Sequence, residues 1–432
     1  MNLPTRFTYA LVGALMCAAA PVAAQTTAFV GGRIVDGTGK VIERGTVIVR
    51  DGKIVQVGPA AGVTVPQGAE RIDLSGLTLM PGLINAHGHI SDVVGLRSDN
   101  VAGITRENVV RQARTYAHYG VTSVFSLGGE PDVTFTVRNE QSKGPLDRAR
   151  LFIGGPIIGE NSADAARAAT DKTAALKPDL IKIRVDDNLG SGKKMAEEGW
   201  RATIRRANEL ELPLAAHIYY LADAKGVLSA GARVIAHSVR DVPVDTEFVQ
   251  MMKTRNACYS PTLMREVSTY VYGSTPEWVN DPFFLSGLGE DADSIKKQLM
   301  DPQRQAQIQG TGAYKQGLKY RDQLAVAKKN LKTLADAGVL IAMGTDTGPA
   351  GRFQGFFEHL ELEMMVDSGL TPMQAIVAAT GGAARCYGKQ GQIGSIQSGA
   401  AADFLIVKGN PLQDIKATRN ISSIWIGGRR LR

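Results

Sequence analysis

Histidine, lysine and aspartate side chains recur within or at the ends of short apolar runs along the chain. Four of the six histidines share this setting with one lysine and one aspartate. Residues two positions apart on a strand point to the same side, so His87 and His89 can face one centre across Gly88. Neutral imidazole and carboxylate groups are ligands of zinc and similar divalent ions. A single histidine is usually structural, but the joint pattern predicts a metal site made of His87, His89, Lys182, His217, His237 and Asp346.

Eight β-type runs position these side chains. The runs are nearly continuous in apolar residues, as parallel strands buried on both faces are, and helical stretches lie between them. Such alternation predicts an α/β fold, a (β/α)8 TIM barrel, in which the carboxyl ends of the strands converge. A doubly wound parallel sheet is the alternative. The runs cover residues 83–89, 121–127, 149–155, 179–185, 213–219, 233–239, 257–263 and 340–346.

Both ends of the chain are rich in β signals. Two β runs joined by Asp51-Gly52 have the pattern of a hairpin, and a similar texture returns near the C-terminus. Neither end has enough strands for a stable sheet, so we expect one small β-sandwich domain made from both. The expected organisation is a signal peptide at 1–24, the N-terminal segment of the β-sandwich at 25–80, the barrel at 81–390 with a helical insertion at about 268–335, and the C-terminal segment of the β-sandwich at 391–432.

The first 24 residues have the pattern of a secretory signal peptide. Arg6 precedes an apolar stretch at 7–20, which is too short to span a bilayer. Small residues follow and predict cleavage after Ala24. The mature protein is then expected to be periplasmic or secreted, without membrane contact. The alternatives are a core helix, a membrane anchor or lipid attachment at Cys17.

Composition and charge narrow the range of partners. The 432-residue chain has 44% hydrophobic and 21% charged residues, which is typical of globular proteins. Its net charge of +7 is spread along the chain, whereas nucleic-acid binding requires clustered basic residues. We therefore expect no nucleic-acid partner. Cys258 and Cys386 remain after signal removal, and either a disulfide or buried free thiols fit the sequence.

Several separated motifs resemble the amidohydrolase superfamily. They are the 80–84 segment before the His87-Gly88-His89 pair, Lys182, His217, His237, the 344–346 segment, and the 370–375 and 394–403 segments. The pattern is most similar to the imidazolonepropionase-related branch, which includes prolidase-like and Xaa-Arg dipeptidases. The resemblance implies a (β/α)8 barrel beside a composite β-sandwich, with metal-dependent hydrolysis.

The resemblance also implies a ligand assignment for two divalent metal ions, with zinc expected. His87, His89 and Asp346 would hold one ion, and His217 and His237 the other. Lys182 would be carboxylated and bridge them, because a protonated amine has no free lone pair; an unmodified lysine is the alternative. A metal-activated hydroxide would attack the carbonyl, and Asp346 would carry a proton from the water to the leaving group.

Residues just past the strand ends are candidates for substrate binding. Tyr219 and Tyr220 follow His217 and could donate to an oxyanion, with packing under a loop as the alternative. Arg184, Arg240 and Arg352 could pair with a substrate carboxylate, although a solvated or salt-bridged arginine is the more common case. His359 could line the pocket or cap a helix.

These features together predict an exported binuclear amidohydrolase acting on a small molecule. The expected substrate is a dipeptide or N-acyl amino acid, including amide-linked xenobiotics. One alternative is hydrolysis of a lactone, carbamate or other ester at the same metal site, because the fold and ligands do not choose the substrate. Another is a non-catalytic binding protein, although relatives of that kind usually lack some ligands. A homo-oligomer is common among relatives.

Overall fold

The computed structural model describes residues 26–432. The expected signal peptide at 1–24 lies outside the described residues. Across residues 26–432, no helix combines the length and apolar character needed to cross a membrane.

Eight parallel strands form a closed barrel, one strand for each apolar run in the sequence. They pair in two arcs, β10-β9-β6 and β11-β12-β13-β14-β15. Backbone hydrogen bonds join the arcs, from Ile158 N to Lys182 O (2.9 Å) and from Ala86 N to Met343 O (2.8 Å). The barrel is therefore confirmed. The strands are β6 (Leu83–Gly88), β9 (Val121–Ser126), β10 (Arg150–Ile153), β11 (Ile181–Arg184), β12 (Leu214–His217), β13 (Val234–Ala236), β14 (Cys258–Ser260) and β15 (Leu340–Ile341).

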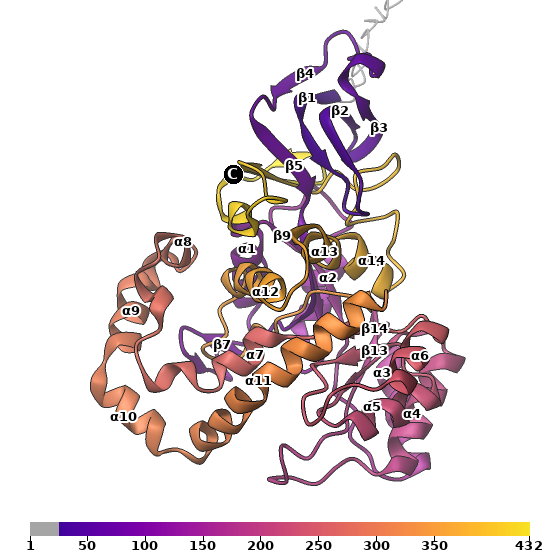
Figure 1. The fold of residues 1–432 in the computed structure, drawn as a ribbon, viewed down its shortest axis with the longest axis vertical. Coiled ribbons are helices and arrows are strands. Elements are labelled where there is room, and N and C mark those ends of the chain that lie inside the picture. Colours follow the sequence, from indigo (N-terminus) through magenta and orange to yellow (C-terminus); the bar gives the residue numbers. More distant parts are fainter. Residues whose placement is uncertain (1–25) are drawn as a thin grey trace, which may run out of the picture.

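Helices follow the strands and cover the outside of the barrel (Figure 1). Several begin at a side chain that accepts a hydrogen bond from the first turn, as Thr105, Ser162, Asp245 and Thr371 do. These caps fix where each helix starts after its loop. The helices are α1 (Arg106–His118), α2 (Val133–Glu140), α3 (Ala163–Ala175), α4 (Glu197–Glu209), α5 (Leu221–Ala230), α6 (Thr246–Thr254), α12 (Phe356–Asp367), α13 (Pro372–Ala378) and α14 (Gly381–Cys386).

A second domain, of β-sandwich type, contains one mixed sheet drawn from both chain ends. The order is β18-β17-β16-β5-β1-β2-β3, with β4 also paired to β1. Asp51 and Gly52, at φ 51° and 74°, turn β2 into β3, which confirms the hairpin. The strands are β1 (Thr26–Val35), β2 (Val41–Arg50), β3 (Lys53–Pro59), β4 (Glu70–Asp73), β5 (Leu77–Pro81), β16 (Phe404–Lys408), β17 (Ile421–Ile426) and β18 (Arg429–Arg430).

A helical segment lies between β14 and β15. Figure 1 shows α8, α9 and α10 extending to one side of the barrel, and α11 running back toward it. Apolar side chains such as Trp278, Phe284 and Phe353 pack this segment against the loop that follows β15. The helices are α7 (Leu263–Ser268), α8 (Pro282–Ser286), α9 (Ala292–Met300), α10 (Pro302–Gly310) and α11 (Gly312–Asp336). A short hairpin, β7 (Val93–Val94) and β8 (Arg97–Ser98), follows β6.

Cys258 and Cys386 form a disulfide, which decides between the two alternatives left by the sequence. The bond links β14 to the end of α14, with a Cα–Cα distance of 5.6 Å and a sequence separation of 128 residues. Both cysteines are buried among apolar side chains. The bond thus ties a barrel strand to the last barrel helix.

We expect the double substitution of Cys258 and Cys386 by alanine to lower the free energy of unfolding by about 2–5 kcal/mol. The reason is that the disulfide restricts the conformations of the unfolded chain, and its removal raises the entropy of the unfolded state. Denaturant unfolding of both proteins, with and without reductant, checks this. Reductant should destabilise the wild type and leave the variant unchanged; a wild type indifferent to reductant contradicts the expectation.

Candidate metal centre

Three side chains from opposite ends of the barrel sequence meet at its mouth. His87 and His89 come from β6 and the turn after it, and Asp346 follows β15. Asp346 Oδ1 lies 2.8 Å from His89 Nε2 and 3.5 Å from His87 Nε2. One ligand atom from each of the three residues falls within 4.8 Å of the others. Among the described residues, this is a group able to hold a metal ion.

The other three predicted site residues lie beside this group. The ring of His237 is 4.5 Å from that of His87 and 4.1 Å from that of His217, measured between centroids. Lys182 Nζ lies 3.3 Å from His87 Nε2. The fold therefore brings all six residues into one cluster, although they are far apart along the chain.

The electrostatics of the cluster suit divalent cations. Burial lowers the pKa of His217 to about 4 and those of His87 and His237 well below the usual value, so the rings are neutral near pH 7. His237 Nε2 is buried and has no hydrogen-bond partner in the described part of the protein. Neutral rings with free lone pairs beside an ionised carboxylate are the donors that zinc accepts. The residues present fit a metal centre.

Partner groups orient three of the imidazole rings. His89 Nδ1 donates to Gly128 O (3.0 Å), and His237 Nδ1 contacts Thr262 Oγ1 (2.8 Å). Asp186 Oδ2 lies 3.2 Å from His217 Nε2. Such contacts fix which ring nitrogen is available and which way the ring faces. Sequence reasoning missed Asp186, although it stands four residues after Lys182 and directly follows the same run.

Strained backbone surrounds the same residues. His237, Thr262 and Asp346 adopt positive φ values of 75°, 49° and 58°. Residues with a Cβ rarely occupy this region, and they persist there only where the surrounding structure imposes it. His237 and Asp346 both follow the ends of their strands, and both side chains lie in the cluster. Three of the nine non-glycine residues with positive φ in the described chain thus belong to the cluster or contact it.

A buried polar network supports the loop that carries Asp346. Glu358 Oε1 accepts hydrogen bonds from Thr345 Oγ1 (2.9 Å) and Thr347 Oγ1 (2.7 Å), the two neighbours of Asp346. Asn85 Nδ2 donates to the same oxygen (2.5 Å), and Asn85 Oδ1 accepts from His87 N (2.9 Å). The network joins the first and last strands behind the cluster. Sequence reasoning found no signal for it.

The predicted substrate residues lie in different settings. Arg352 contacts Asp346 Oδ2 and donates from Nε to Ser268 Oγ (3.1 Å), so it stands at the cluster. Arg184 is more exposed and pairs with Asp186 (3.1 Å). Tyr219 is buried beneath the Arg240 guanidinium, and Tyr220 donates to Asp187 (3.0 Å). Of these, Arg352 has the most direct contact with the metal group.

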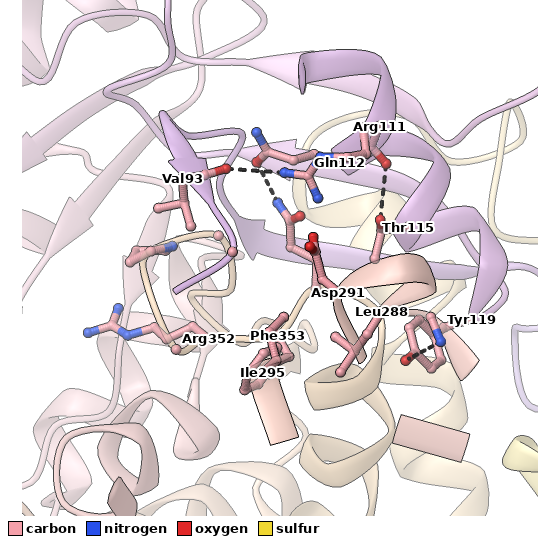
Figure 2. A pocket seen from close by; sticks show the side chains of 16 residues that line it. Val93, Arg111, Gln112, Thr115, Tyr119, Leu288, Asp291, Ile295, Arg352 and Phe353 are labelled. Atoms are coloured by element: carbon pink, nitrogen blue, oxygen red, sulfur yellow. Dashed lines mark hydrogen bonds between the residues drawn. The ribbon is translucent and has the colours of Figure 1, made fainter. Parts of the chain in front are cut away.

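A small cavity lies beside the loop that follows Asp346. It has a volume of about 70 Å³, and Arg352, Phe353, Arg111, Leu288 and Asp291 are among its lining residues. Figure 2 shows Arg111 and Gln112 on one side and Leu288 and Asp291 facing them from the helical segment. The metal-site histidines do not line it. Arg352 lines this cavity and also contacts Asp346 of the metal group.

The structure corrects the expectation for His359. This side chain is fully buried on α12, away from the cluster. Its Nε2 contacts Tyr119 O (2.8 Å) and its Nδ1 contacts Thr418 Oγ1 (3.0 Å), where the barrel meets the C-terminal segment. Both nitrogens are occupied and the ring has no route to a substrate. His359 is a structural residue at the junction of the two domains.

His359 gives a testable pH dependence of stability. Burial lowers its pKa to about 4, against about 6.5 in an unfolded chain. The unfolded state therefore binds the proton more readily between these values, so stability is fully present above pH 6.5 and is lost as the pH falls toward 4. We expect His359→Gln to reduce this slope in denaturant unfolding measured from pH 7.5 to 4.5. An unchanged slope contradicts the assignment.

The chain is similar to known proteins over nearly its whole length. It matches the amidohydrolase family over residues 78–431. It is 24% identical to ochratoxinase from Aspergillus niger, covering 94% of this chain and 86% of that protein. A putative prolidase from Bifidobacterium longum has a TM-score of 0.73 and 23% identity, covering 94% of each chain. A Xaa-Pro dipeptidase with bound methionine has a TM-score of 0.73 and 22% identity, covering 94% of this chain and 99% of the other.

The family match spans the whole barrel and the C-terminal strands, and both structural likenesses extend over nearly the whole chain. The chain therefore belongs to the amidohydrolase family of hydrolases that act on carbon-nitrogen bonds.

Proposed function

We propose that this protein is an exported amidohydrolase that uses two divalent metal ions, with zinc expected. It cleaves the amide bond of an N-acyl amino acid or dipeptide, including amide-linked xenobiotics. The observation that carries the proposal is the single cluster at the barrel mouth, in which the buried His87 and His237 lie with the partly exposed His217 and His89, Lys182 and Asp346. His87, His89 and Asp346 would hold one ion, and His217 and His237 the other.

Lys182 is the bridging candidate. Burial lowers the pKa of its amine to about 7, so much of it is neutral at physiological pH. A neutral amine can add carbon dioxide to form a carbamate, which supplies a negatively charged ligand. Its Nζ already lies 3.3 Å from His87 Nε2. Carboxylation of Lys182 would therefore place an anionic bridge between the two groups of ligands.

Bound metal ions would supply a polarised carbonyl and an activated water. With the ions bound, Asp346 would accept a proton at its carboxylate and return it to the leaving nitrogen. Its pKa stays well below the usual value despite burial, because Arg352 and His89 lie against the carboxylate. Asp346 is thus ionised and ready to accept a proton at neutral pH. The Glu358 network keeps its loop fixed during the transfer.

The relatives support an amide of an amino acid as the substrate. One is an ochratoxinase, and two solved structures are a putative prolidase and a Xaa-Pro dipeptidase with methionine in its active site. The names of the last two proteins both denote hydrolysis that releases a free amino acid.

The test is a mass-spectrometric turnover screen of the zinc-loaded protein. The library holds dipeptides, N-acyl amino acids, lactones and aryl carbamates, with Asp346→Asn as the inactive control. Cleavage of amides that carry a free α-carboxylate supports the proposal. Cleavage of lactones or carbamates alone would move the substrate class to esters, and silence in a protein that binds the library members would indicate a binding protein.

Export is a separate element of the proposal. The N-terminal pattern at 1–24 supports it, and so does the Cys258–Cys386 disulfide, because such bonds persist in oxidising compartments. Intact-mass measurement of the protein from the periplasm and the medium tests it. A chain that begins after Ala24 is the expected result, and a full-length chain confined to the cytoplasm contradicts it.

A further inference from the structure

Two guanidinium groups and one carboxylate are buried together beside the metal cluster. Arg240 follows β13, and Arg265 and Glu266 lie on α7. All three side chains are nearly inaccessible, at 0%, 8% and 0% exposure. Glu266 pairs with both arginines, through Oε1 to Arg240 Nε (3.2 Å) and Oε2 to Arg265 Nη1 (2.9 Å). One carboxylate is therefore the ion-pair partner of two permanently charged arginines.

Arg240 is held in place by its surroundings. Its Nη1 donates to Ser238 O (2.5 Å), and its guanidinium lies over the rings of Tyr219 and Tyr320 at 4.6 and 5.3 Å from their centroids. The group is enclosed and points at protein atoms. Its Nε and Nη2 make no hydrogen bond among the described residues, and its contact with Glu266 Oε1 is an ion pair that places the carboxylate between the two arginines.

Arg265 has donor capacity left over and faces the metal cluster. Its Nε is buried without a hydrogen-bond partner in the described part of the chain. That nitrogen lies 3.9 Å from Asp346 Oδ2, and Arg352 contacts the same oxygen. Tyr320 closes the other side, with its ring centroid 4.5 Å from the Arg265 guanidinium carbon. Two arginines from different segments thus converge on one edge of the cluster.

A buried charge of this kind is costly unless an anion neutralises it. Glu266 is shared with Arg240, and Asp346 would be occupied by a metal ion and already contacts Arg352. A further anion bound beside Asp346 would supply the missing partner. A carboxylate fits best, because its two oxygens match the donor fork of a guanidinium.

We propose that Arg265, with Arg352 beside it, forms a subsite for a carboxylate of the substrate. The inference rests on the proposed amide hydrolysis and adds the residue that selects acidic substrates. It also assigns a role to the helical segment, because α7 begins that segment and delivers Arg265 to the barrel mouth. The preference for acidic substrates then depends on a segment of the chain that carries none of the six predicted metal-site residues.

The test compares two amides that differ only in the carboxylate, N-benzoyl-L-phenylalanine and N-benzoyl-2-phenylethylamine. Values of kcat/KM are measured for the wild type, Arg265→Met and Arg265→Lys, with the surface variant Arg201→Met as the matched control. We expect Arg265→Met to lower kcat/KM about 10- to 100-fold for the acid and to leave the uncharged amide nearly unchanged. Arg265→Lys should recover some of the loss. Equal losses for both amides overturn the proposal.

Calorimetry separates this inference from the proposed function. L-phenylalanine and benzoate are titrated into the same zinc-loaded proteins, whose metal content is measured first. If no amide is cleaved but a carboxylate binds, and Arg265→Met weakens that binding about 10-fold or more, the subsite stands while the hydrolysis proposal fails. Absence of carboxylate binding to the wild type, or equal binding to Arg265→Met, overturns the subsite. If Arg265→Met does not fold, Arg265→Lys carries both assays, with a smaller loss in the same direction.

Discussion

Asp346→Asn is expected to lower kcat by about 10²–10⁴-fold while the protein stays folded. An amide side chain of the same shape can still occupy the space between His89 and Arg352, so packing is preserved. It cannot accept a proton at neutral pH, and loss of a positioned general base costs a rate of this order. Steady-state kinetics on the best substrate from the screen give the measurement.

The control for this variant is Asp322→Asn, at an exposed aspartate on α11 whose partner is its neighbour Arg321. Both variants should keep the wild-type circular dichroism spectrum and thermal transition. Activity of Asp346→Asn within a few-fold of the wild type would remove Asp346 from the proton transfer. Loss of activity in Asp322→Asn as well would point to a general defect of the preparation.

Lys182→Ala is expected to lower bound metal from two ions per chain to one or none, and activity by orders of magnitude. The substitution removes the lysine of the cluster and leaves a gap beside His87. Without an anionic bridge, the neutral histidines His217 and His237 hold a divalent ion less tightly. Elemental analysis after dialysis measures the metal, and native mass spectrometry of the wild type detects the added carbon dioxide.

A surface variant provides the comparison for Lys182. Lys332→Ala removes a lysine that pairs with Asp336 on α11 and should leave the metal content unchanged. One tightly bound ion in both the wild type and Lys182→Ala would refute the bridging role. An unmodified wild-type lysine in the native mass spectrum would refute carboxylation alone.

The barrel and the ligand cluster could be predicted because their signals are local. Buried parallel strands are apolar on both faces, so each of the eight runs was visible in the sequence, and residues at the strand ends meet by topology. Thus His87, His217 and Asp346 could be grouped without knowing any distance. The composite β domain was predicted for a similar reason, since each chain end showed strands that needed partners.

The features that sequence reasoning missed depend on packing between distant segments. Glu358 accepts a hydrogen bond from Asn85, which is 273 positions away in the sequence. Arg265 lies near Asp346 because the helical segment packs against the barrel mouth. The wrong expectation for His359 has the same origin. Glu358 and His359 are adjacent on α12, where neighbouring residues point about 100° apart, and only the packed structure shows which one faces the barrel loop.

The sheet shared by both chain ends has a consequence for how the protein is made. Strand β16 lies between β5 and β17, so the edge of β5 is covered only by residues 404–408. During synthesis the first strands emerge long before this partner, which lies at the far end of the chain. Until then, β5 offers open backbone groups of the kind that promote aggregation. A chain truncated before residue 404 would therefore keep every barrel strand but leave the β5 edge without its partner.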